Sequence, residues 1–165
     1  MKIKFGNYLL EIDVDRTREF YQSVDKTVEG CQCSGCRNFE KAVNIFPDEV
    51  KQFFDQIGVD PAEPAEVYGN CSEDHGRKVF YGGFYHLCGR VIEGDSPWVS
   101  AGQTKEAVIN QYHWDSDLTY QITDGYYVGF NNGGALIAEN FPRPVVQMEI
   151  EFHIPWVLEE ENDYP

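Results

Sequence analysis

The sequence has few basic side chains: 13 lysine and arginine residues stand against 28 aspartate and glutamate residues, which gives a formal net charge of −15. A surface of that charge repels phosphate backbones, so we expect no nucleic-acid partner. Most of the imbalance falls in residues 61–165, where 5 basic and 17 acidic residues give −12. Such a segment attracts cations or a basic protein, and it also helps keep a protein in solution.

Long hydrophobic runs are also missing. No stretch approaches the roughly 20 apolar residues that cross a bilayer, and the first residues lack the regions of a signal peptide. We therefore expect a cytoplasmic protein with no membrane association, in which thiols stay reduced. The five cysteines are an odd number, which argues against a disulfide framework.

The familiar catalytic and phosphate-binding motifs are absent. The chain has no Gly-x-x-x-x-Gly-Lys loop, no Gly-x-Ser-x-Gly elbow and no His-Glu-x-x-His pair. The segment Asn-Asn-Gly-Gly at 131–134 is typical of a turn. These absences favour a non-catalytic binding or interaction protein over an enzyme.

A length of 165 residues suits one domain. Apolar residues recur at helical spacing in 37–45 and in 47–57, where Pro47 suits a helix start and Gly58 a helix end. Alternating apolar residues, rich in tyrosine and phenylalanine, predict strands or hairpins at 3–14, 66–71, 78–92, 118–130, 136–141 and 145–158.

Three other segments complete the prediction. Residues 15–30 are polar without a clear period, 104–112 are expected to form a short helix, and 159–165 an acidic, frayed tail. Residues 1–165 are thus predicted to form a single α+β domain. It would have a mainly antiparallel, aromatic-rich sheet and a short helical pair near one end.

Three cysteines lie within six residues: Cys31, Cys33 and Cys36. They alternate with Gln, Ser and Gly and so make no apolar stripe, which argues against a role in packing alone. Thiolates at this density suit a structural zinc ion, which commonly takes four ligands. His86 and Cys88 share one face of a predicted strand and could supply the fourth ligand, with Cys71 and His75 as weaker candidates.

Two other interpretations of the cluster stay open. The cysteines could be reduced thiols packed in a tight turn under the helices. Alternatively, Cys33 and Cys36 could form a thiol-exchange motif, with the thiol pKa lowered by a helix N-terminus and by Arg37. No strand–helix–strand pattern surrounds the motif, which argues against a thioredoxin-like enzyme.

Other polar and aromatic groups have ordinary structural explanations. The segment His113-Trp114-Asp115-Ser116-Asp117 could bind a cation or act in acid–base chemistry, but Asp and Ser more often cap turns. The aromatics could line a groove for sugars or peptides, but strand alternation favours places in the core. They are Trp98, Trp114, Tyr126, Tyr127 and Trp156.

Four segments together carry a resemblance: Cys-Gln-Cys-Ser-Gly-Cys-Arg-Asn-Phe (31–39), Ile-Gly-Val-Asp-Pro (57–61), Tyr-Gly-Gly-Phe-Tyr-His (81–86) and Ile-Pro-Trp-Val-Leu (154–158). They resemble an uncharacterised family of small bacterial proteins that has no established activity. The resemblance implies a single-domain bacterial protein and transfers no catalytic residue.

The sequence therefore predicts a non-catalytic binding domain, with zinc at the cysteine cluster as its cofactor. A thiol-dependent enzyme that uses Cys33 and Cys36 is the first alternative. The second is an acidic immunity-type protein that neutralises a basic partner, through carboxylates such as Asp115, Glu149 and Glu151 if these form one surface. Glu149 and Glu151 also alternate as the solvent face of a terminal strand would.

Overall fold

The structure is a computed structural model that describes residues 1–24, 31–100 and 112–165. The helix expected at 104–112 lies outside the described residues, apart from Tyr112, which begins a strand. No helix in the described part of the chain has the length and apolar character needed to cross a membrane.

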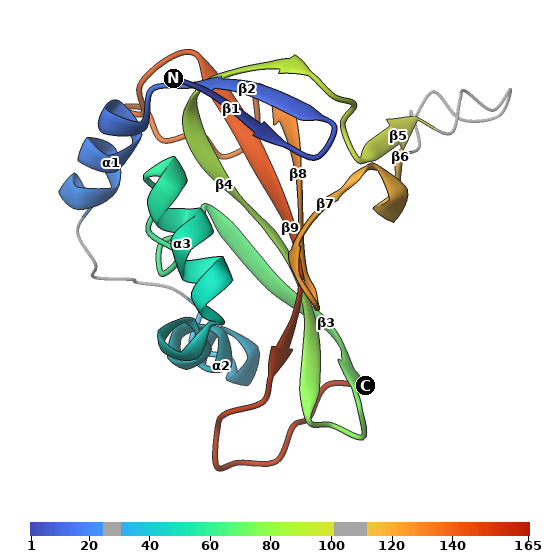
Figure 1. The fold of residues 1–165 in the computed structure, drawn as a ribbon. Helices are drawn as coiled ribbons and strands as arrows, with labels where there is room; N and C mark the ends of the chain where they lie inside the picture. The colour runs from blue at the N-terminus through green and yellow to red at the C-terminus, as the bar shows by residue number, and fades with distance from the viewer. Residues whose placement is uncertain (25–30, 101–111) are drawn as a thin grey trace, which may run out of the picture.

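Seven antiparallel strands form the main sheet, in the order β1-β2-β4-β9-β8-β7, with β3 also paired to β4 (Figure 1). The long central strands β4 and β9 hold the sheet together, and β4 pairs with three neighbours. A separate two-stranded hairpin consists of β5 and β6. The bounds are β1 Lys2–Phe5, β2 Tyr8–Ile12, β3 Glu66–Glu73, β4 Lys78–Glu93, β5 Trp98–Ser100, β6 Tyr112–Trp114, β7 Tyr120–Thr123, β8 Tyr126–Asn132 and β9 Val145–Pro155.

Helices cover one face of this sheet (Figure 1). They are α1 Val14–Ser23, α2 Ser34–Ala42 with the 3₁₀ turn η1 Val43–Ile45, and α3 Asp48–Ile57. As predicted, α3 starts after Pro47 and ends at Gly58, whose φ of 76° is the left-handed conformation that suits glycine at a helix end. The α+β fold with an aromatic-rich antiparallel sheet is confirmed.

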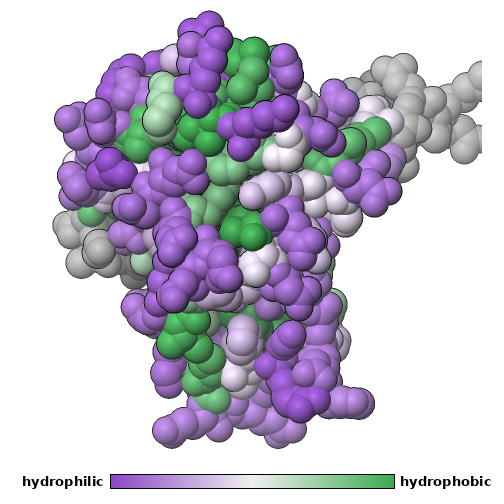
Figure 2. All heavy atoms as spheres, in the orientation of Figure 1, coloured by the Kyte–Doolittle hydropathy of each residue, from purple (hydrophilic) through white to green (hydrophobic). Residues whose placement is uncertain are grey.

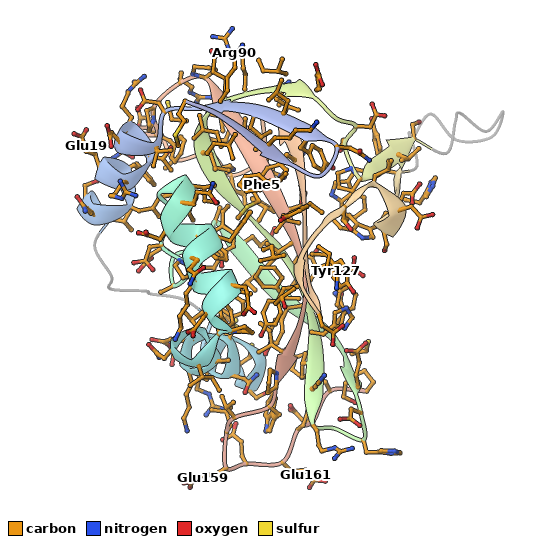
Figure 3. All side chains as sticks on the ribbon, viewed as in Figure 1. Phe5, Glu19, Arg90, Tyr127, Glu159 and Glu161 are labelled. Atoms are coloured by element: carbon orange, nitrogen blue, oxygen red, sulfur yellow. The ribbon has the colours of Figure 1, made fainter. Side chains whose placement is uncertain are left out.

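The core lies between the helices and the sheet, and aromatic rings fill much of it. The rings of Phe5 and Phe53 are tilted with centroids 5.0 Å apart, and Phe54 meets Tyr85 edge-on with centroids 5.1 Å apart. Figure 3 shows Phe5 on the helical side of the sheet and Tyr127 on the opposite side. In the view of Figure 2, hydrophilic residues cover most of the surface, and apolar residues show in small separate areas.

Three segments differ from the sequence-based predictions. Residues 15–23, expected to lack a regular element, form most of α1, which Asp13 caps by accepting from the Arg16 N–H. The apolar pattern was weak because one of its two buried residues is the polar Thr17, whose hydroxyl donates to the Asp13 carbonyl at 2.8 Å. Residues 136–141, predicted as a strand, form none. The tail after β9 has no regular element either, but it is hydrogen-bonded to the rest of the domain instead of frayed, as at Ser72, whose N–H donates to the Pro165 carbonyl at 2.7 Å.

Candidate metal site

The three cysteines come together at the start of α2. Cys33 is the N-cap residue in an extended conformation, Cys36 lies in the first helical turn, and Cys31 precedes both. The three sulfur atoms all lie within 4.8 Å of one another. Cys31 and Cys33 are exposed and Cys36 is partly buried, so solvent reaches the group.

The start of α2 is fixed to the sheet by buried hydrogen bonds. The Tyr81 hydroxyl donates to the Gly35 carbonyl at 2.7 Å, and Asn38 Nδ2 donates to the Tyr81 oxygen at 3.2 Å. The Asn38 side chain also accepts from the Val157 N–H at 2.7 Å. Because Asn38 is fully buried in this network, the backbone that carries the cysteines is positioned before any ligand binds.

The environments of two of the thiols differ. A hydrogen bond from the Cys36 N–H, followed by contact with Cys31, lowers the pKa of Cys33. Burial raises the pKa of Cys36 to about 12, and its neighbours Cys33 and Cys31 add to the rise. The lowering at Cys33 was expected from a helix N-terminus. The Arg37 guanidinium binds Glu160, and its charge also interacts with Cys33.

The C-terminal segment covers this end of α2. Asp163 accepts from the Ser34 hydroxyl at 2.8 Å, and Glu160 accepts two bonds from Arg37. Figure 3 shows Glu159 and Glu161 pointing away from the domain, while Glu160 between them turns inward to Arg37. We call residues 159–165 the C-terminal strap.

Tyr164 is a residue of the strap that lies against the cysteine cluster. A Cβ atom on Gly35 would lie 1.9 Å from its hydroxyl oxygen, and one on Gly69 would lie 2.7 Å from its ring, so the ring fits only against glycine at both positions. Burial raises the pKa of Tyr164, and the neighbouring Cys33 and Cys36 add to the rise. The sequence predicts a frayed tail here, because Glu159, Glu160 and Glu161 are identical residues and only the folded chain distinguishes the one that binds Arg37.

His86 and Cys88, the predicted sources of a fourth ligand, are not part of the cysteine group. Strand β4 meets the start of α2 at Tyr81, and His86 lies five residues further along, about 16 Å at a strand rise of 3.3 Å per residue. His86 is buried between Phe84 and Phe141, and burial lowers its pKa. Cys88 is buried near the Arg143 carbonyl, and burial raises its pKa.

The remaining candidates have structural roles. Cys71 and His75 are also outside the cysteine group. Asp115 accepts a hydrogen bond from the Asp117 N–H and caps a short 3₁₀ turn, η2 (Ser116–Leu118). This is the turn-capping role that the sequence favoured over a cation site. Of the five aromatics, only Tyr126 is in the core. Trp156 is partly buried and packs against the core, Trp114 and Tyr127 are partly buried, and Trp98 is exposed.

Comparisons of the chain with models of protein families, with curated proteins and with solved structures give no match.

Proposed function

We propose that this protein is a non-catalytic binding domain that holds a zinc ion through Cys31, Cys33 and Cys36. The observation that carries the proposal is the distance between the three sulfur atoms, none more than 4.8 Å from another. Thiolates bound to one tetrahedral zinc, at about 2.3 Å each, lie about 3.8 Å apart. The sulfur atoms therefore need to move by about 1 Å at most, a shift that thiol side chains at a solvent-exposed helix start can make.

Three protein ligands leave one coordination position for another donor. No histidine, carboxylate or further cysteine of the described residues joins the group, so water or a donor from a partner would take that position. The ion would tie the segment before α2 to the first turn of the helix. Its charge would also stabilise thiolates that burial otherwise disfavours, as at Cys36.

Metal analysis and cobalt substitution test this proposal. We expect protein purified without chelator to carry about one zinc per chain, and Co²⁺ added to the metal-free protein to give thiolate charge-transfer absorption. Cys33→Ser should lose most of both signals, whereas Cys71→Ser, outside the group, should keep them. Metal-free protein that gives no cobalt spectrum would contradict the proposal.

The contrast between Cys33 and Cys36 favours thiol–disulfide exchange as a second candidate. The exposed Cys33 thiolate would attack a substrate disulfide, form a mixed disulfide and release one substrate thiolate. Cys36, once deprotonated, would then attack Cys33, release the second substrate thiolate and leave a Cys33–Cys36 disulfide, which a dithiol reductant would reduce again. The substrate gains the two electrons that the pair loses.

A kinetic comparison separates the two candidates. Thiol exchange predicts that metal-free protein reduces a model disulfide much faster than free cysteine does, and that Cys33→Ser and Cys36→Ser both abolish turnover while Cys31→Ser keeps it. The zinc proposal predicts that all three substitutions weaken metal binding to a similar extent. Loss of metal binding in Cys31→Ser is thus the decisive result.

A further inference from the structure

The sheet face opposite the helices carries carboxylates and aromatic rings in two neighbouring rows that cross the strands. One row runs Tyr127, Glu151, Gly82 and Tyr68, and the next runs Gly129, Glu149, Phe84 and Glu66, each across β8, β9, β4 and β3. Tyr126 packs in the core against Phe46, so strand alternation turns Tyr127 to the other face, as Figure 3 shows. We call Glu66, Tyr68, Tyr127, Glu149 and Glu151 the acidic–aromatic strip.

Two of its carboxylates are held in place without a cationic partner. Glu149 is 5% exposed and accepts a hydrogen bond from Gln147 Nε2, and Glu151 is also largely covered, although their alternation suggested a solvent face. Glu151 accepts from Trp114 Nε1 at 3.0 Å and from the Ser116 hydroxyl at 3.3 Å. Among the described residues, no lysine or arginine pairs with either carboxylate.

An uncompensated charge near a low-dielectric surface leaves a strong local potential. The nearest imidazole, His153, has Nε2 4.0 Å from Glu151, but its Nδ1 is bound to Glu73 at 2.6 Å. Lys78 on β4 lies four residues from Gly82, about 13 Å along the strand. The negative potential of the strip is therefore not neutralised within this part of the fold.

Tyr68 adds an aromatic surface to that potential. Its ring lies on Gly82, where a Cβ atom would come within 2.8 Å of the ring, and the residue remains 43% exposed. Burial raises the pKa of Tyr68, and the nearby carboxylates Glu149 and Glu66 raise it further, which places both negative charges close to the phenol. Glu66 itself is exposed.

We propose that the acidic–aromatic strip docks an arginine side chain presented by a basic partner protein. The guanidinium is planar and weakly hydrated, so it can stack on the open face of Tyr68 while its N–H groups bond a carboxylate such as Glu66. A lysine ammonium offers a compact charge without the planar surface and would bind more weakly here. A second copy of this chain is disfavoured, because two acidic strips would repel each other.

Synthetic tetra-arginine and tetra-lysine peptides are the probes for this surface. Calorimetric titration should give tighter binding of tetra-arginine, with an affinity that falls as salt rises. In Glu66→Gln/Tyr68→Ala, tetra-arginine binding should weaken about tenfold, the size expected when a cation–π contact and an ion pair are both lost. Both residues are exposed, so the variant should fold normally, which circular dichroism would check.

The matched control removes an equal charge and truncates an exposed apolar side chain on the helical side. Glu19→Gln/Ile45→Ala meets this condition, since Glu19 is exposed on α1 (Figure 3) and Ile45 is 61% exposed. It should weaken binding less than about twofold, as a distant exposed charge does. Equal loss in both variants, or equal affinity for the two peptides, would show nonspecific attraction and overturn the proposal.

Two further outcomes would also overturn it. Wild-type protein that does not bind tetra-arginine at low salt has no such site. A wild-type dimer in sedimentation that Tyr68→Ala converts to a monomer would show that the strip is a self-association surface. Neither result depends on the metal content of the cysteine group, so this inference and the zinc proposal can fail separately.

Discussion

Arg37 and Glu160 lie 123 residues apart and are joined by two hydrogen bonds, one of them 3.2 Å from Nη1 to Oε2. The pair connects α2 to the C-terminal strap directly beside the cysteine cluster. Both side chains are more than 40% exposed, so water screens their attraction. The pair therefore fixes the direction of the strap more than it stabilises the fold.

Glu160→Gln should lower the free energy of unfolding by no more than about 1 kcal/mol, the upper range for an exposed ion pair. The difference from wild type should shrink as salt is added, because the ions screen the charge. Urea denaturation at low and high salt measures it, with Glu159→Gln as the control, since Glu159 points away from the domain. A decrease of several kcal/mol in the free energy of unfolding that persists at high salt would instead show that the Arg37–Glu160 pair is what holds the strap on the domain.

Packing of Tyr164 on Gly35 should contribute more to the stability of the domain than the Arg37–Glu160 pair does. Gly35→Ala places a methyl group 1.9 Å from the tyrosine hydroxyl, so either the ring or the helix start must move, at a cost of about 1–3 kcal/mol. With Tyr164→Ala already in place, the clash is gone, and alanine within α2 should stabilise by up to about 1 kcal/mol. Gly35→Ala should thus change sign between the two backgrounds, which a double-mutant cycle by urea denaturation reveals. The same sign in both would place Tyr164 away from Gly35 in solution.

Glu149 should make stability depend on pH in the opposite direction to an ion-paired carboxylate. Burial raises its pKa in the folded state above the unfolded value, so the folded protein binds a proton more readily. As pH falls from neutral through the raised pKa of the folded state, protonation of Glu149 increases the free energy of unfolding. The increase ends once the pH is below the pKa of Glu149 in the unfolded chain. Glu149→Gln should therefore compare more favourably with wild type at pH 7.5 than at pH 5.

Chemical denaturation at both pH values measures this difference. Glu40→Gln is the control, because Glu40 is exposed on α2 and should show little change between the two conditions. The prediction would be contradicted if Glu149→Gln lost the same stability at pH 5 as at pH 7.5. That result would mean that the carboxylate is in contact with water in the folded protein.

The sequence predicted those features that depend on neighbouring residues. Pro47 and Gly58 bound α3 because each acts on its own turn. Cys31, Cys33 and Cys36 are neighbours in sequence, and the start of α2 at Ser34 turns the chain so that their sulfur atoms meet. The helix α1 was not predicted, because one of its two buried residues, Thr17, is polar and so interrupts the apolar pattern at helical spacing.

Features that depend on long-range contacts were not accessible. The contact of Ser34 with Asp163 spans 129 residues, so nothing near Asp163 predicts that the strap is ordered. His86 was predicted as a ligand near the cysteines, but it lies outside the cysteine group. The position of His86 along β4 relative to α2 depends on strand pairing, which neighbouring residues do not reveal. Glu149 is likewise buried where alternation alone predicts an exposed residue, because groups distant in the sequence, such as Trp98 of β5, lie against it.

Acidification should destabilise the protein through His86. The imidazole is 3% exposed, its Nε2 has no hydrogen-bond partner among the residues that the structure describes, and burial lowers its pKa below the value in the unfolded chain. The folded state therefore holds this histidine neutral, and the unfolded chain takes up the proton first. The stability present above the unfolded pKa of about 6.5 is lost progressively as pH falls toward the lower folded value.

His86→Leu removes both the titrating group and the unpartnered nitrogen while it keeps apolar contacts with Phe84 and Phe141. The free energy of unfolding of this variant should change less between pH 8 and pH 5.5 than that of the wild type. His113→Gln, an exposed site on β6, should follow the wild type. Protonation of Glu149 changes stability in the opposite direction to protonation of His86. The change in the free energy of unfolding with pH is therefore best compared when the parent protein and both histidine variants also carry Glu149→Gln. If His86→Leu and its parent showed the same change in the free energy of unfolding with pH, His86 would be hydrated in the folded protein. Burial of His86 would then not be the cause of the acid sensitivity.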